Sequence, residues 1–168
     1  MRHHLLALTI LGYIDKVYHG IAPFVFPTNP NQRAMPRFWA AYIANKIVAP
    51  RWNMFGRKTD KKKDEGREEI FASEETQQRA LTECCRGKPF FGGDNVRYVD
   101  VILGGMVSTM QPTGELYGRV FHDATKTPLL LVWMMDHFSE LDPAKMVLPD
   151  IGRLAAFAKM KQAQKALN

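Results

Sequence analysis

An aspartate in the first turn of an otherwise apolar helix is the feature that most restricts how this 168-residue chain can fold. The helix is expected to run from about Tyr98 to Met110, after a glycine-rich turn at 92–93. If it begins near Arg97, Asp100 falls at the third helical position, where a carboxylate can accept the backbone N–H left free at the cap. Because an unpaired buried charge is costly, capping is the simplest role for Asp100. The alternative role, that of a catalytic acid, has no partner residue nearby in the sequence.

The composition is that of one globular domain with a real core. Hydrophobic residues make up 46% and charged residues 24% of the chain, an ordinary globular balance. The net charge is +6, but the basic residues are dispersed, and the run at 61–63 directly precedes two acidic residues. No nucleic-acid-binding motif accompanies that run, so we expect no nucleic-acid partner.

The cysteines and histidines argue against a disulfide framework and a metal site. Cys84 and Cys85 are adjacent, and neighbouring cysteines bridge only with strain. A reducing compartment fits this usage, and we expect a cytoplasmic location. The five histidines show no metal-ligand spacing, so no metal is expected. No segment approaches membrane-spanning length, so we expect no membrane partner.

The N-terminus imitates a short signal peptide, but no small-residue cleavage site follows it. Apolar residues instead recur there at helical spacing, which predicts an amphipathic helix ending at 19–20. The residues with this spacing are Leu6, Ile10, Tyr13, Ile14 and Val17.

Helical patterns continue along the chain. After a proline-punctuated connector, Asn29 is a suitable cap and Pro30 a suitable first residue for a long helix, bent at Pro36 and Pro50 and reaching Phe55. Further helices are expected over 60–85, 98–110 and 127–138, then a short turn at 143–147 and a last helix from Asp150 as cap. No segment alternates convincingly as a strand, so the expected fold class is all-α.

Two apolar faces follow the long helix. One face carries Phe38, Tyr42, Asn45, Val48, Trp52 and Phe55, and the other carries Met35, Trp39, Ile43 and Ile47. In the helix over 60–85, only Ile70, Phe71, Ala80 and Leu81 are available as anchors. The last helix is expected to turn Ile151, Leu154, Phe157 and Ala158 inward.

Four ordered motifs match those of a known family. They read RAM and RFWAAYI with KIVAP over 33–50, PFFGG with YVD over 89–100, TPLL at 127–130 and LPDIGR at 148–153, and YID at 13–15 fits the same family. In this order they make the chain similar to the C-terminal domain of plant tau-class glutathione transferases, preceded by the last helix of the thioredoxin-like N-terminal domain. The resemblance covers nearly the whole chain.

The resemblance implies a glutathione transferase C-terminal-like helical bundle with one extra N-terminal helix. Residues 1–20 would be a remnant of the thioredoxin-like domain, 21–30 a linker, and 31–168 the helical domain. In this family the N-terminal domain binds the co-substrate glutathione and supplies the catalytic serine. Where a Glu-Ser pair would grip the glutamyl end of glutathione, this chain has His3 and His4. We therefore expect no catalytic and no glutathione-binding residue in this chain.

The domain that the resemblance covers is the one that holds an apolar co-substrate in this family, so hydrophobic small molecules are the expected partners. The pocket wall would fall on Val48, Trp52, Phe55, Thr109, Phe157 and Lys161. Spacing alone places the first three on one helical face, and an aromatic stripe of this kind can be either pocket or core. Without a packing partner, the first helix would expose a patch that promotes association or homodimerisation. That patch would consist of Leu5, Leu6, Leu8, Ile10 and Leu11.

Four departures from the family pattern predict lost stability. Arg97 is a poor cap, and Pro36 costs roughly 3 kcal/mol if the helix is regular there. Glu74 and Gln77 stand where the family places aliphatic residues, and burying them unpaired would cost about 1–3 kcal/mol each. These departures predict a truncated and decaying copy or an incomplete gene model.

Three functional readings remain open at this point. The first is conjugation of glutathione to hydrophobic electrophiles in detoxification. The second is a non-catalytic helical module for apolar ligands or a partner, and the third is no independent function. The two cysteines do not supply another nucleophile, because both lie at an expected helix C-terminus, where the dipole disfavours a thiolate.

Overall fold

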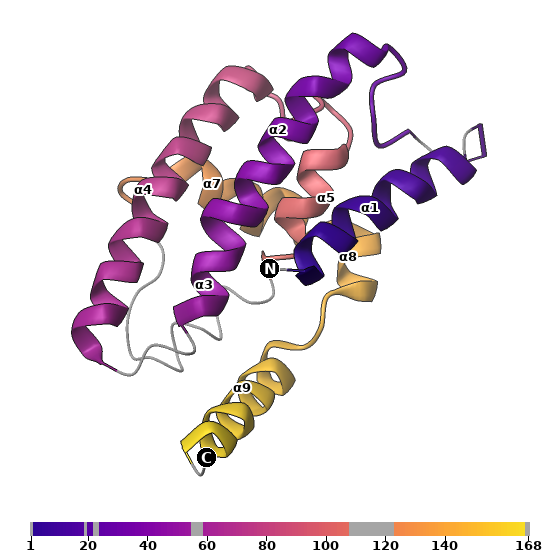
Figure 1. Ribbon diagram of the computed structural model, residues 1–168. Helices are drawn as coiled ribbons and strands as arrows, with labels where there is room; N and C mark the ends of the chain where they lie inside the picture. The colour runs from indigo at the N-terminus through magenta and orange to yellow at the C-terminus, as the bar shows by residue number, and fades with distance from the viewer. Residues whose placement is uncertain (1, 19, 22–23, 55–58, 108–122, 167–168) are drawn as a thin grey trace.

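The computed structural model describes residues 2–18, 20–21, 24–54, 59–107 and 123–166. Within these ranges the regular structure is helical, with a single isolated bridge between Phe90 and Gly93 and no strand. The predicted all-α class is therefore confirmed (Figure 1). No helix within those ranges is both long and apolar enough to cross a membrane.

Helix α1 (Arg2–Val17) lies against the connector and the start of the central helix. Asp15 ties α1 to the connector, since its Oδ1 accepts the backbone N–H groups of Val25 at 2.8 Å and Phe26 at 3.3 Å. Leu8 and Leu11 pack on the small cluster that holds Phe26, so the prediction that both are exposed is wrong. Leu6 and Ile10 of the predicted patch do lie at the surface, and so do Tyr13, Ile14 and Val17 of the same helix. Leu5 lies outside the described side chains.

The predicted long helix is one continuous helical run of changing type. It consists of a 3₁₀ turn η1 (Pro30–Arg33), α2 (Ala34–Tyr42), a π-helical stretch η2 (Ile43–Val48) and α3 (Ala49–Met54). The predicted cap is present, because Asn29 Oδ1 accepts the N–H of Asn31 at 3.0 Å. Pro36 falls in the first turn of α2, directly after the 3₁₀ turn, so the regular helix assumed for its full penalty is absent.

One side of this run forms the core. Its buried residues are Ala40, Ile43, Ala44, Ile47 and Arg51. The predicted face through Phe38 and Asn45 is wrong at those two positions, since both are exposed. Of the second predicted face, Met35 is exposed and Trp39 is half-buried. The π-helical stretch contributes to this difference, because its wider turn shifts every later residue relative to a regular α-helix.

Helix α4 spans Asp60–Cys85, as predicted, and lies alongside η2 and α3 (Figure 1). Thr59 caps it through its hydroxyl, which accepts the N–H of Lys62 at 3.4 Å. It ends at Arg86, whose positive φ of 49° reverses the chain. Of the predicted anchors, Ile70, Ala80 and Leu81 are buried and Phe71 is half-buried.

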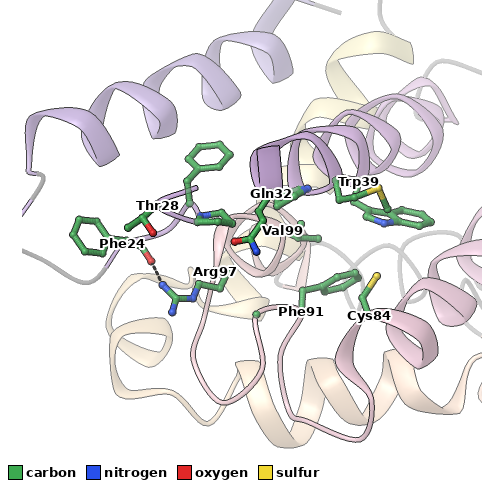
Figure 2. A pocket seen from close by; sticks show the side chains of 13 residues that line it. Phe24, Thr28, Gln32, Trp39, Cys84, Phe91, Arg97 and Val99 are labelled. Atoms are coloured by element: carbon green, nitrogen blue, oxygen red, sulfur yellow. Dashed lines mark hydrogen bonds between the residues drawn. The ribbon is translucent and has the colours of Figure 1, made fainter. Parts of the chain in front are cut away.

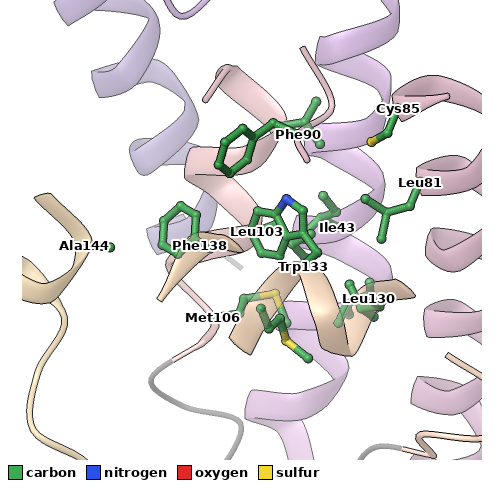
Figure 3. Packing of buried hydrophobic residues seen from close by; sticks show 13 residues of the cluster. Ile43, Leu81, Cys85, Phe90, Leu103, Met106, Leu130, Trp133, Phe138 and Ala144 are labelled. Atoms are coloured by element: carbon green, nitrogen blue, oxygen red, sulfur yellow. The ribbon is translucent and has the colours of Figure 1, made fainter. Parts of the chain in front are cut away.

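The central helix α5 (Tyr98–Gly104) packs against α2 and against the stretch formed by α7 (Pro128–Val132) and a second π-helical segment η3 (Trp133–Phe138). Trp133 is buried at the centre of the main cluster, with Leu103, Ile43 and Phe138 around it (Figure 3). A β-carbon on Gly104 would lie 1.9 Å from the Phe138 ring, so only glycine allows this close approach. The central α-helix ends at Gly104, earlier than the predicted Met110, and Thr109 lies outside the described residues.

The C-terminal part contains α8 (Asp142–Val147) and α9 (Ile151–Ala166). The turn predicted at 143–147 is in fact helix α8, which has Pro143 in its first turn. Asp150 caps α9 as predicted, accepting the N–H of Arg153 at 2.9 Å. The inward face predicted for α9 is wrong at Phe157, which is 52% exposed, whereas Ala155 is buried.

Candidate functional site

The predicted pocket wall is distributed over η2, α3 and α9. Val48 ends η2 and packs, half-buried, against the main core cluster. Phe157 does not join that cluster and stands largely at the surface of α9, which Figure 1 shows set apart from the α2–α4 group. Trp52 lies on α3 and Lys161 on α9, but their side chains are outside the described part of the structure. Phe55 and Thr109 lie outside the described residues altogether.

A buried ion pair holds α3 against α4 beside this wall. Arg51 Nη2 donates to Glu74 Oε1 at 2.7 Å, and the two side chains are 3% and 0% exposed. Burial lowers the pKa of Arg51, and the Glu74 carboxylate opposes that shift. Glu74 is therefore buried with a partner, and the cost given for burying it unpaired does not apply. The pair therefore fixes the position of α3 on α4 at the residue before Trp52.

Sequence reasoning missed Arg51, although two signals point to it. Arg51 continues the buried spacing of Ile43 and Ile47, and a buried Glu74 requires a cation on a facing helix. Gln77, one turn after Glu74, is also fully buried. Its amide nitrogen and oxygen find no hydrogen-bond partner among the residues described, so the predicted cost of about 1–3 kcal/mol applies to Gln77.

Asp100 is the most connected polar side chain of the central helix. Its Oδ2 accepts the N–H of Arg97 at 2.9 Å, which is the capping bond expected for the third helical position. Its Oδ1 accepts the N–H of Phe91 and the indole N–H of Trp133, both at 3.1 Å. Burial raises the pKa of Asp100 to about 6, and these three hydrogen bonds oppose the rise. Asp100 is 0% exposed and therefore has no path to a substrate.

Arg97 provides no side-chain cap, as predicted from its residue type. Its guanidinium instead donates through Nη1 to the carbonyl of Phe24 in the connector. The central helix is thus capped by Asp100 alone and is joined to the connector by Arg97.

The two thiols are poorly placed for nucleophilic chemistry. Burial raises the pKa of Cys85 to about 12, with a further contribution from the Asp100 carboxylate. Burial also raises the pKa of Cys84, assisted by Glu83 and opposed by the Trp39 indole. The predicted scarcity of thiolate is supported, although burial rather than the helix dipole is the main cause. Within the described ranges, no three His, Cys, Asp or Glu side chains gather as metal ligands.

Comparison with known proteins identifies relatives of this chain. No protein-family model matches the chain. It is 43% identical over 146 residues to the probable glutathione S-transferase GSTU6 of rice (Oryza sativa subsp. japonica), an alignment that covers 84% of this chain and 61% of that protein. This chain therefore spans about three fifths of the length of that relative.

Solved structures agree with that match. The tau-class glutathione S-transferase MiGSTU of mango (Mangifera indica) superposes with a TM-score of 0.82 at 30% identity, covering 92% of this chain and 69% of the mango chain. Rice GST1 (OsGSTU1), solved in complex with glutathione, superposes with a TM-score of 0.79 at 22% identity and supports the fold. The identity and coverage shared with the mango enzyme, together with the rice match, place this chain in the tau class of plant glutathione S-transferases.

Proposed function

We propose that this chain supplies the half of a tau-class glutathione transferase that binds the hydrophobic electrophile, in a detoxifying conjugation to glutathione. Family membership carries this proposal. The described geometry supports it, because the Arg51–Glu74 pair anchors α3 beside the predicted pocket wall. The co-substrate of the family is glutathione, and a glutathione complex is known for the rice neighbour.

The role of this half is positional. Val48, Trp52, Phe55, Thr109, Phe157 and Lys161 form the proposed wall. An apolar electrophile held near an activated thiol reacts as in a unimolecular step. This proximity by itself contributes a large part of the rate enhancement. No catalytic residue is proposed in this chain, since Asp100 is enclosed and both cysteine pKa values are raised.

Binding of the electrophile 1-chloro-2,4-dinitrobenzene, measured by equilibrium dialysis, tests the proposal. For Trp52→Ala we expect the Kd for the electrophile to rise roughly tenfold, equivalent to about 1.4 kcal/mol of lost binding. Phe38→Ala is the matched control, because Phe38 is an exposed aromatic residue of the same helical run. Equal electrophile Kd values for the two variants would contradict the pocket assignment.

A second candidate function is association without catalysis. The exposed face of α1 favours it, since Leu6, Ile10 and Tyr13 are each about half exposed or more. Such a face suits a homodimer or another protein partner. This candidate is preferred if the chain does not bind the electrophile, yet sediments as a stable dimer.

A further inference from the structure

The buried ion pair between α3 and α4 lies beside the proposed electrophile site but offers no surface to a ligand. Arg51 is 3% exposed and Glu74 is 0% exposed, and Arg51 Nη2 donates to Glu74 Oε1 at 2.7 Å. The pocket of about 390 Å³ in Figure 2, whose lining includes Trp39, Cys84 and Phe91, contains neither residue of the pair. Any effect of the pair on binding must therefore act through a neighbouring residue.

The rotation of α3 about its own axis does not follow from α2. The π-helical stretch η2 lies between the two helices and interrupts the regular repeat of about 3.6 residues per turn. Among the described side chains of α3, Arg51 is buried, whereas Ala49 and Pro50 are small and half-buried. Apolar contacts have no direction, so small apolar side chains allow several rotations of a helix on its neighbour. A hydrogen bond between one nitrogen and one oxygen is directional, so the pair selects one of these rotations.

A second polar contact reaches the same turn of α4 from the other end of η2. Tyr42, the last residue of α2, donates its hydroxyl to the carbonyl of Ser73 at 3.4 Å. Tyr42 and Arg51 thus bind neighbouring residues of α4 from the two ends of the π-helical stretch. Because burial keeps water away from the Arg51–Glu74 pair, its charges attract each other more strongly than those of a surface pair. The stretch that leads into Trp52 is therefore held on α4 at both ends.

We propose that Arg51 and Glu74 form a positioning pair for the electrophile: they fix the rotation of α3, and with it the direction in which Trp52 projects. Successive residues of an α-helix project about 100° apart, so a helix held at Arg51 has one direction for the next residue. Trp52 belongs to the proposed pocket wall, so this inference rests on the proposed function. A wall residue held in place by such a supporting contact loses less conformational freedom on binding, which raises the affinity for the ligand.

Removing the pair while keeping the fold tests the inference. The double variant Arg51→Met/Glu74→Leu replaces a directional contact by an apolar one of similar volume. We expect its urea unfolding to stay cooperative and close to that of the wild type. Its Kd for 1-chloro-2,4-dinitrobenzene in equilibrium dialysis should nevertheless be about fivefold higher, because Trp52 is no longer held in one direction.

Glu74→Asp is a milder variant that keeps both charges in the core. It draws the carboxylate back by one methylene group, so the bond to Arg51 must lengthen or α3 must shift. We expect the Kd for the electrophile to rise about threefold. Glu75→Asp is the matched control, because Glu75 pairs with Lys126 at 3.1 Å and both side chains are about half exposed. Its Kd should change by less than about twofold.

Fluorine NMR gives a readout that needs no ligand. The chain has three tryptophans, so 5-fluorotryptophan labelling gives one signal for each, and Trp52→Phe identifies the signal of Trp52. In the double variant the Trp52 signal should shift or broaden. The signals of Trp39, beside Cys84 in Figure 2, and of Trp133, in the core cluster of Figure 3, should stay unchanged.

Three results would each overturn the inference: an unchanged Trp52 signal in the double variant, wild-type electrophile affinity in that variant, or equal Kd values for Glu74→Asp and Glu75→Asp. If the wild-type chain binds no electrophile, the proposed function fails, and the Trp52 signal still decides whether the pair positions α3.

Discussion

Replacing Asp100 by alanine is expected to lower the free energy of unfolding by about 3–5 kcal/mol. The substitution leaves three donors without their acceptor: the buried indole N–H of Trp133 and the part-buried N–H groups of Phe91 and Arg97. These donors come from the preceding loop, the helix start and η3, so a single side chain joins three segments. Urea denaturation followed by circular dichroism measures the change.

Asp100→Asn separates capping from charge. Asparagine keeps an oxygen for Phe91 and Trp133 but turns an amide NH₂ toward the N–H of Arg97, so we expect a loss of about 1–2 kcal/mol at pH 7. The pKa of Asp100 is raised from 3.8 to about 6, so the folded state binds its proton more tightly than the unfolded state does. The contribution of Asp100 to stability is therefore present at low pH and decreases as pH rises through about 4–6.

This titration predicts the direction of a pH effect. The stability difference between the wild type and Asp100→Asn should be about 1 kcal/mol larger at pH 5 than at pH 7. Asp94→Ala is the control in the same loop, because the Asp94 carboxylate pairs with Lys88 at the surface and should contribute less than about 0.5 kcal/mol. A difference that is equal at both pH values, or smaller at pH 5, would contradict the assigned role of Asp100.

Breaking the Arg51–Glu74 pair should have an effect of similar size. Arg51→Met leaves Glu74 ionised in the core, and we expect a loss of about 3–5 kcal/mol in thermal or urea unfolding. The double variant Arg51→Met/Glu74→Leu removes both charges and should regain most of that loss. We therefore expect the pair to fix the packing of α3 on α4 while adding little to the net free energy of unfolding.

Lys126→Ala provides the comparison for an exposed pair. Lys126 and Glu75 are joined at 3.1 Å with both side chains about half exposed, so their loss should cost well under 1 kcal/mol. If the Arg51→Met and Lys126→Ala variants lose equal stability, or if the double variant is no better than Arg51→Met, the buried pair does not have the role assigned to it.

Local sequence signals predict many of the helix boundaries and caps. Helix α4 begins at Asp60 and ends at Cys85 as predicted, and Asn29 and Asp150 are the caps that the sequence predicts. These features depend on a few neighbouring residues. Local physical chemistry therefore determines them before any tertiary contact forms.

Local sequence signals do not predict the features that depend on tertiary contacts. The two π-helical stretches, η2 and η3, have no local sequence signal and alter which residues face the core after them. The central position of Trp133 follows from a bond to Asp100 across 33 residues, and the pairing of Glu74 with Arg51 spans 23. Local periodicity carries no information about such partners.

In the candidate site, too, local spacing is predictive and tertiary packing is not. Helical spacing placed Val48 and Trp52 on one run, and the structure seats Val48 against the core. Phe157 was expected inward and lies largely exposed, because α9 stands apart from the helices that bury the rest of the chain (Figure 1). Its role in the pocket wall stays a prediction.

Photolabelling tests most directly the claim that the α3–α9 end of this chain holds the apolar co-substrate. An aryl-azide conjugate of glutathione, photolysed with the full chain and mapped by peptide mass spectrometry, should label peptides from α3 (Ala49–Met54) and α9 (Ile151–Ala166). S-methylglutathione, which lacks the aryl group, should compete weakly, and an unreactive aryl conjugate should compete fully. Labelling confined to α2 (Ala34–Tyr42) or to the exposed face of α1 would contradict the claim.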